Sequence, residues 1–331
     1  MKTETSCPFQ VSRSHALQGN GYVLDVVVSP SRDIVATPTA SGAIHIFDSK
    51  TLNGLKTLNV TNPTDRYDDV LSQATFDQSN PSLLFAGTTN GTVRVWDLRT
   101  GNSELIFNCG KPVLSLAVNS ANTALAAGTE LVGEDSEISI WDVRNNSAPA
   151  ARFLECHSDD VTQLRFHPTD RNAMISGSTD GLICLYNLET LEEEDALYQV
   201  IKENSIGKIG FFGPQYEYIY SLSHMETFSL YKFLEGDKVF TFGDVRGEAQ
   251  QTKVDYLIDC VYDERNQRMF LVTGDQTGNM AIFHVNLGRL ELVHTLNSGH
   301  SDIVRGAYWD VEYGSLISGG EDSIVSLWRN Q

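Results

Sequence analysis

Two stretches of this 331-residue sequence carry serine, histidine and aspartate at matching positions. The two trios are His157, Ser176 and Asp180, followed by His300, Ser318 and Asp322. A serine, a histidine and an aspartate are the groups that a hydrolase uses as nucleophile, base and orienting carboxylate, so an esterase-like activity is one hypothesis. A catalytic site is seldom built twice in one chain. The duplication therefore favours a structural role for both trios, and an aromatic residue lies at an equivalent position in each stretch, Tyr186 or Trp328.

The other residues that often carry chemistry lack the spacing of a site. The histidines His45, His284 and His294 have no acid or cysteine at metal-ligand spacing, and no Gly-rich phosphate-binding loop is present. The five cysteines are scattered without a C-x-x-C pair, and their odd number does not suit a disulfide framework. We therefore expect no catalytic residue, no metal and no cofactor, and we do not expect an enzyme.

The charge balance limits the kinds of partner. The chain has 24 Lys and Arg residues against 43 Asp and Glu residues, which gives a formal net charge of −19. Nucleic acids and anionic membranes are disfavoured, because both bind mainly to lysine and arginine. Hydrophobic residues make up 41% of the chain, which is enough for a packed core. The first residues lack the apolar segment of a secretory signal, so we expect a location in the nucleus, the cytoplasm or both.

A repeat runs through the whole chain. An aromatic residue ends a short alternating strand every 45 to 52 residues: Phe47, Trp96, Trp141, Tyr186, Tyr231, Phe283 and Trp328. A second series lies in register with the first and ends an earlier apolar strand: Val28, Phe76, Val118, Phe166, Phe212, Tyr262 and Trp309. A further apolar run, closed by a polar turn, lies between the two series, and a short strand follows each aromatic residue. Each repeat is thus predicted to contain four strands and no helix.

These repeats resemble the WD-repeat β-propeller family, whose four-stranded blade opens with Gly-His and closes with Trp-Asp. The matching pairs are Trp96-Asp97, Trp141-Asp142 and Gly299-His300. The resemblance implies an all-β, seven-bladed propeller in one domain over residues 1–331, and the compact form is similar to the WD repeat-containing protein 89 group. The blades are expected at about 21–60, 68–108, 112–155, 157–202, 206–242, 256–297 and 299–331. Blade five has the weakest turn, because Ser223-His224-Met225-Glu226 replaces the usual Gly or Asp turn.

The last blade ends after its third strand, so its outer strand must come from elsewhere. The resemblance implies that residues 6–17 supply this strand and close the ring, which otherwise leaves an unpaired edge. In the same family, the residue types of the two trios form a buried network within a blade. This implication favours the structural interpretation of His157, Ser176, Asp180 and Tyr186, and of His300, Ser318, Asp322 and Trp328.

Three long loops indicate where a partner binds. They span 61–69, 129–136 and 243–255. Each is either a loop between two blades or a loop between the second and third strands of a blade. Both kinds of loop emerge on the same face of a propeller, which we call the top face. The partner-binding candidates on this face are Asp65, Tyr67, Asp68, Asp69, Glu134, Asp159, Asp160, Asp302, Arg305 and Glu321. An acidic face favours a basic protein partner. We predict a non-catalytic scaffold, acting as an assembly chaperone or complex subunit, with a monomeric propeller inside a larger complex.

An alternative function depends on a short motif. Arg99 and Arg144 end two Trp-Asp-x-Arg sequences in adjacent repeats. These sequences resemble the motif of WD-repeat substrate receptors of cullin-4 ubiquitin ligases, in which the arginine contacts the adaptor. The resemblance implies that Arg99 and Arg144 bind such an adaptor.

Overall fold

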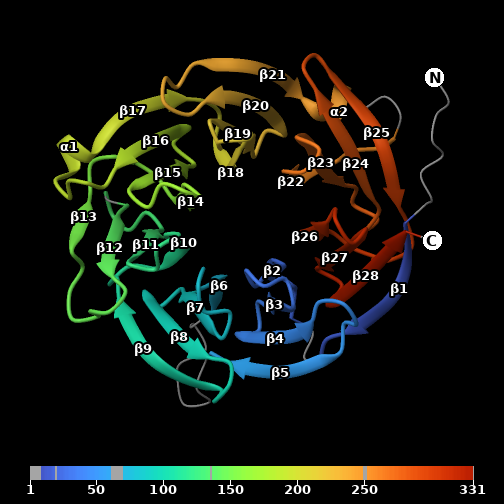
Figure 1. Cartoon of the computed structure of the whole chain (residues 1–331), viewed down its shortest axis with the longest axis horizontal. Coiled ribbons are helices and arrows are strands. Elements are labelled where there is room, and N and C mark those ends of the chain that lie inside the picture. Colours follow the sequence, from blue (N-terminus) through green and yellow to red (C-terminus); the bar gives the residue numbers. More distant parts are fainter. Residues whose placement is uncertain (1–8, 19–20, 61–69, 135, 249–251, 331) are drawn as a thin grey trace.

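Seven four-stranded antiparallel sheets are arranged as blades around a central axis (Figure 1). This computed structural model describes residues 9–18, 21–60, 70–134, 136–248 and 252–330. In six blades the strands follow one another in chain order, which is the simplest way to build an antiparallel sheet from short turns. The prediction of an all-β, seven-bladed propeller is confirmed.

The strands of the first four blades are short and even in length. Blade 1 contains β2 (Val27–Val28), β3 (Ile34–Pro38), β4 (Ala43–Asp48) and β5 (Gly54–Asn59). Blade 2 contains β6 (Leu71–Phe76), β7 (Leu83–Thr88), β8 (Thr92–Asp97) and β9 (Asn102–Asn108). Blade 3 contains β10 (Val113–Val118), β11 (Ala124–Thr129), β12 (Ile138–Asp142) and β13 (Ala151–Phe153). Blade 4 contains β14 (Val161–Phe166), β15 (Ala173–Ser178), β16 (Leu182–Asn187) and β17 (Leu197–Lys202).

The remaining blades complete the circle. Blade 5 contains β18 (Ile206–Phe212), β19 (Tyr218–Ser223), β20 (Thr227–Lys232) and β21 (Lys238–Asp244). Blade 6 contains β22 (Tyr256–Asp263), β23 (Arg268–Gly274), β24 (Met280–Asn286) and β25 (Arg289–Leu296). Blade 7 contains β26 (Val304–Asp310), β27 (Ser315–Gly320), β28 (Ile324–Asn330) and β1 (Phe9–Ala16).

The N-terminal strand closes the ring. Strand β1 pairs antiparallel with β28, from Phe9 opposite Asn330 to Ala16 opposite Ile324. The first and the last strand of the chain therefore share one blade, and Figure 1 shows β1 beside β28. The expected closure by the N-terminal segment is confirmed.

Two single-turn helices lie in the connections, where the sequence predicted no helix. They are α1 (Glu193–Ala196), which precedes β17, and α2 (Val245–Glu248), which follows β21. The Glu193 carboxylate accepts the backbone amides of Leu154 and Glu155 at 2.7 and 2.8 Å, so α1 fastens the edge of blade 3. Within the described part of the chain, neither helix is long and apolar enough to cross a membrane.

Blade 5 keeps a regular turn despite its unusual sequence. The last turn residue before the third strand has a left-handed backbone in both blades: Gly181 in blade 4 with φ 82°, and Glu226 in blade 5 with φ 60°. A side chain in this conformation costs roughly 1–2 kcal/mol. In blade 5 the Glu226 carboxylate accepts the Leu257 amide of the next blade at 2.7 Å, and this bond offsets the cost.

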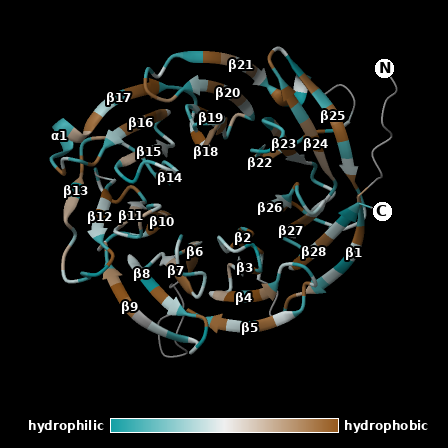
Figure 2. Ribbon diagram, viewed as in Figure 1, coloured by the Kyte–Doolittle hydropathy of each residue, from teal (hydrophilic) through white to brown (hydrophobic). Residues whose placement is uncertain are grey.

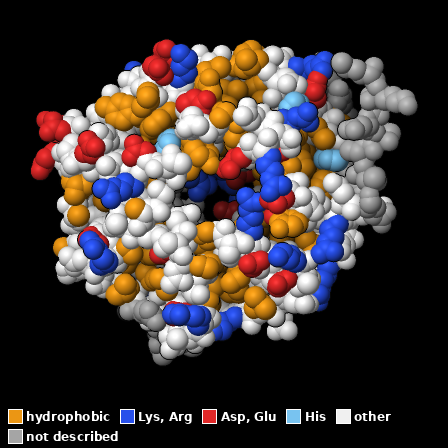
Figure 3. Space-filling view, viewed as in Figure 1, with side chains coloured by type: hydrophobic (Ala, Val, Ile, Leu, Met, Phe, Trp, Pro, Cys, Tyr) orange, Lys and Arg blue, Asp and Glu red, His pale blue; other side chains and the backbone are white. Residues whose placement is uncertain are grey.

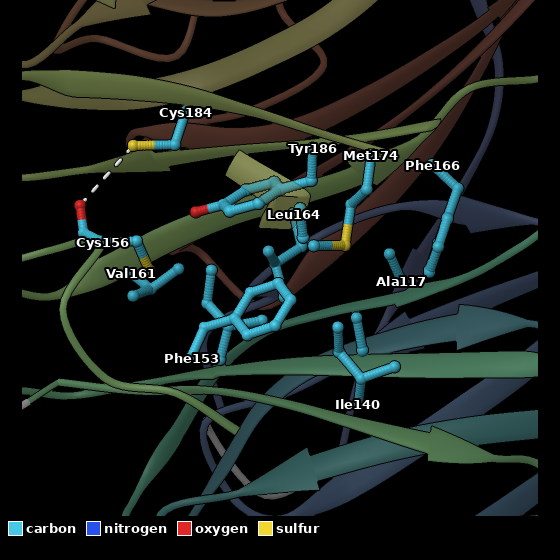
Figure 4. Packing of buried hydrophobic residues seen from close by; sticks show 13 residues of the cluster. Ala117, Ile140, Phe153, Cys156, Val161, Leu164, Phe166, Met174, Cys184 and Tyr186 are labelled. Carbon is cyan, nitrogen blue, oxygen red and sulfur yellow. Dashed lines mark hydrogen bonds between the residues drawn. The ribbon is translucent and has the colours of Figure 1, made fainter. Parts of the chain in front are cut away.

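The core is divided into clusters between neighbouring blades. Figure 2 shows hydrophobic segments interspersed with hydrophilic ones along the strands of the ring. In Figure 4, Phe153 and Ile140 of blade 3 lie next to Tyr186, Leu164 and Met174 of blade 4, and the Phe153 and Tyr186 rings stack at 5.4 Å. Each blade buries both of its faces in this way, so the blades position their turns rigidly at the two ends of the ring.

Candidate protein-interaction surface

One hydrogen-bond network joins the polar residues of blade 4. His157 Nδ1 lies 3.0 Å from an Asp180 carboxylate oxygen, and His157 Nε2 lies 2.6 Å from Ser176 Oγ. Ser176 Oγ lies 3.0 Å from the Tyr186 hydroxyl. His157 precedes β14, whereas Asp180 lies in the turn between β15 and β16. The network therefore ties the loop that enters the blade to the turn on the same face.

Blade 7 repeats this network with tryptophan in place of tyrosine. Trp328 Nε1 donates to Ser318 Oγ at 2.8 Å, Ser318 Oγ lies 2.7 Å from His300 Nε2, and His300 Nδ1 lies 3.2 Å from the Asp322 carboxylate. An indole N–H only donates and a carboxylate only accepts. Ser318 Oγ consequently accepts from the indole of Trp328, and the Asp322 carboxylate accepts from His300 Nδ1–H.

The carboxylates of both networks are held in their charged form. Burial acts to raise the pKa of Asp180 and Asp322, but hydrogen bonds from His157 and His300 and from nearby backbone amides outweigh it, so both pKa values lie below the usual range. Ser176 and Ser318 have 0% exposed surface. A nucleophilic oxygen must reach its substrate, and these oxygens are enclosed by their partners. The geometry supports the structural interpretation over the esterase hypothesis.

The top face carries most of the residues proposed for partner binding. The loop at 129–136 packs against the opening of blade 4: Asp160 accepts the Leu131 amide at 2.8 Å, and Ser136 Oγ donates to the His157 carbonyl at 3.0 Å. The exposed Glu134 therefore lies in a loop anchored beside Asp159 and Asp160. Asp302 is exposed at the opening of blade 7. The candidates Asp65, Tyr67, Asp68 and Asp69 lie outside the described residues.

Three basic residues of this face are held in ion pairs. Arg305 Nε donates to Glu321 at 2.7 Å, Arg246 pairs with Asp244 at 2.7 Å, and Lys253 pairs with Asp255 at 2.6 Å. Other carboxylates of this face form no ion pair with any described residue: Glu130, Glu134, Asp159 and Asp302. The paired cations add little positive field at a distance. The described part of this face therefore combines paired cations with carboxylates that form no ion pair with a described residue.

The two Trp-Asp-x-Arg arginines fold back on their own aspartates. Arg99 holds Asp97 through two nitrogens at 3.0 and 2.6 Å, and Arg144 holds Asp142 at 2.9 and 2.6 Å. Hydrogen bonds from these guanidinium groups lower the pKa of each aspartate to about 2. The arginine side chains are 71% and 79% exposed. They lie in turns between third and fourth strands, which emerge on the bottom face, opposite the top face.

Charged residues in the central channel were missed by the sequence analysis. Lys208 Nζ lies 3.3 Å from Asp259, and the Tyr220 hydroxyl donates to Asp259 at 2.9 Å. Burial acts to raise the pKa of Asp259, but the charges of Lys208 and Arg165 outweigh it and lower this pKa. Figure 3 shows charged side chains of both signs at the central hollow. The sequence does contain a signal that could have revealed these residues. Lys208 and Asp259 are charged residues in the first strands of blades 5 and 6, where most residues are apolar.

Comparisons with known proteins agree with this architecture. Seven four-stranded blades in a closed ring define a β-propeller. The family described as "WD domain, G-beta repeat" matches residues 64–97, 150–187 and 290–329. The WD repeat-containing protein 89 homolog of Dictyostelium discoideum is 31% identical over 93% of this chain and 83% of its own length. This chain therefore belongs to the WD-repeat family, in the group of WD repeat-containing protein 89.

Two further similarities extend the comparison. The WD repeat-containing protein GTS1 of Arabidopsis thaliana is 30% identical over 94% of this chain and 82% of its own length. A chain in the crystal structure of the mitotic checkpoint complex covers 99% of this chain with a TM-score of 0.77, and this chain covers 94% of it. At 14% sequence identity, that similarity shows a shared fold. WD-repeat propellers act generally as protein-interaction scaffolds, and this chain shares their architecture.

Proposed function

We propose that this protein is an interaction scaffold whose acidic top face binds a basic protein partner, in the nucleus or the cytoplasm. It would act as an assembly chaperone or as a subunit of a larger complex. The observation that carries the proposal is the difference in pairing: the described cations Arg246, Lys253 and Arg305 are held in local ion pairs, whereas several carboxylates of the same face are not. Unpaired surface charge steers a partner of opposite charge and repels acidic competitors.

The surface is also rigid enough for selective binding. The Glu134 loop is fixed to blade 4 by two hydrogen bonds, and the openings of blades 4 and 7 are fixed by the two buried networks. A partner thus meets charges at set positions, with little ordering cost in these segments.

The test is quantitative affinity capture from cell extract with wild type and two matched variants. The top variant combines Glu130→Gln, Glu134→Gln, Asp159→Asn and Asp302→Asn, which keep an acceptor oxygen at each position. The control variant combines Glu194→Gln, Glu235→Gln, Asp195→Asn and Asp237→Asn, which remove the same charge from exposed sites outside the top face. We expect basic proteins on wild type and control, and their loss from the top variant and at higher salt. Equal recovery by both variants would contradict the proposal.

A second candidate function is that of a cullin-4 ubiquitin ligase substrate receptor. It is supported by the exposure of Arg99 and Arg144, whose guanidinium groups are oriented by Asp97 and Asp142 in adjacent blades. Purified adaptor should bind wild type, and the double substitution Arg99→Ala with Arg144→Ala should abolish binding. The control is Arg246→Ala, which removes a similar arginine–aspartate pair from the top face. Adaptor binding that survives the double substitution would exclude this candidate.

A further inference from the structure

An apolar groove lies between blades 5 and 6 on the bottom face. It has a volume of about 360 Å³, and its residues come from the ends of strands and the turns that emerge on this face. Three aromatic residues, Phe212, Tyr218 and Tyr262, line it together. The rings of Phe212 and Tyr218 stack at 5.3 Å, and those of Phe212 and Tyr262 meet edge to face at 6.2 Å. Interlocked rings give the groove a fixed apolar wall.

Exposed hydrophobic residues continue from this groove along the outside of blades 4 to 6. Leu287 and Val239 line the groove and are 70% and 37% exposed, and Leu234 in the neighbouring turn is 69% exposed. Tyr198 on β17 adds a fourth such side chain, with 41% exposure. Figure 3 shows hydrophobic side chains gathered over the region of β17, β20 and β21. Exposed hydrophobic side chains beside an apolar groove are typical of a place where another chain binds.

One arginine contributes a positive charge to the lining of the groove, and carboxylates border it: Glu291 lies 3.5 Å from His284 Nδ1, and the charges of Glu217 and Glu264 act on Tyr262. Arg268 is the one formally charged residue among the described residues that line it, and its guanidinium forms no ion pair with any described residue. His284 lies beside it, and burial followed by the charge of Arg268 lowers the pKa of His284. The chain as a whole carries a net charge of −19, and elsewhere on the surface many arginines are paired with carboxylates. An unpaired guanidinium in an apolar groove is therefore complementary to a carboxylate that arrives with hydrophobic neighbours.

We propose that this groove binds a short segment of a partner protein that combines hydrophobic side chains with one acidic side chain. The hydrophobic side chains occupy the wall formed by Phe212, Tyr218 and Tyr262, and the acidic side chain pairs with Arg268. This site goes beyond the proposed function, because it lies on the opposite face and selects the opposite charge. A scaffold with both surfaces holds a basic protein on its top face and an acidic, hydrophobic segment on its bottom face at the same time.

The test starts from a display library of short random peptides selected on the purified full-length protein. The selected peptides are then synthesised with a fluorescent label, each in three forms that carry Glu, Gln or Lys at the acidic position. Binding is measured by fluorescence anisotropy to wild type and to the variants Leu287→Asp and Arg268→Glu. The matched controls are Leu55→Asp, an exposed leucine on blade 1, and Arg171→Glu, an exposed arginine in the turn between β14 and β15 of blade 4.

We expect the selected peptides to combine aromatic or aliphatic residues with an acid, and the Glu form to bind wild type at least tenfold more tightly than the Lys form. Leu287→Asp should weaken binding tenfold or more, whereas both controls should bind as wild type does. Arg268→Glu should reverse the preference, so that the Lys form binds more tightly than the Glu form. This reversal distinguishes a direct contact from partial unfolding, which weakens both forms alike.

Three binding results would overturn the proposal. They are selection of peptides without an acidic residue, equal binding of the Glu and Lys forms, and binding that the Leu55→Asp control weakens as much as Leu287→Asp does. Self-association of wild type that Leu287→Asp abolishes would show that a second copy of this chain occupies the groove, and would also overturn it. None of these results changes the capture experiment on the top face, so the two proposals fail independently.

Discussion

Substitution of a single residue in the closing strand tests how the ring is held together. Phe9 is 4% exposed and packs edge to face against His294 at 4.9 Å and Trp309 at 6.0 Å. Phe9→Ala removes these contacts and leaves a cavity between blades 6 and 7, at a cost of about 3–5 kcal/mol in the free energy of unfolding. An unfolding entropy of about 2.1 cal/mol/K per residue converts this cost into a melting temperature about 4–7 °C lower for 331 residues.

The assay is urea and thermal unfolding followed by tryptophan fluorescence, because Trp309 contacts the substituted side chain. Gln10→Ala is the matched control, since Gln10 lies on the same strand and is exposed. It should change the unfolding free energy by less than about 0.5 kcal/mol. If Phe9→Ala unfolds at the same urea concentration and temperature as Gln10→Ala, the packing of β1 does not hold the ring closed, and the reasoning is wrong.

Three more predictions concern the blades themselves. Trp328→Phe removes the donor to Ser318, so the unfolding free energy should fall by about 1–3 kcal/mol in urea titration; an unchanged value would show that the network adds no stability. Gly181→Ala, where φ is 82° and a Cβ would lie 2.6 Å from a backbone oxygen, should destabilise more than Gly133→Ala, where φ is 76° and no atom lies within 4 Å; equal melting temperatures would refute this. Burial is the main cause that lowers the pKa of five histidines in the folded protein: His45, His167, His224, His284 and His294. The folded protein therefore binds protons at these residues less readily than the unfolded chain, so stability should be full above pH 6.5 and fall as the pH drops below it. A urea midpoint that is constant from pH 7.5 to 5.5 would contradict this prediction.

The blade pattern could be predicted because its markers are also its core. Trp141 and Trp328 are 1% and 0% exposed, and Tyr186 and Tyr231 are 0% and 1% exposed. A large aromatic side chain at the end of the third strand fills the space between two blades, so its spacing in the sequence is the spacing of the blades. This holds in blade 5 as well, where Glu226 takes the turn position that glycine occupies in blade 4.

The pairing of surface charges could not be predicted, because it depends on how loops fold back. The sequence shows Arg305 and Glu321 sixteen positions apart, and the structure brings Arg305 Nε within 2.7 Å of the Glu321 carboxylate. The groove was missed for a related reason. Phe212 and Tyr262 each end an apolar strand, as ordinary core residues do, and their shared wall exists only where blades 5 and 6 meet.

The central claim is that the top face attracts a basic partner through its carboxylates, and association kinetics test it most directly. The partner recovered on wild type is purified, and its association rate constant is measured by stopped flow at ionic strengths above and below the physiological value. We predict that the rate for wild type falls steeply with added salt, whereas the top variant associates slowly with little salt dependence and the control variant behaves as wild type does. Identical rates and salt dependence for wild type and the top variant would contradict the account.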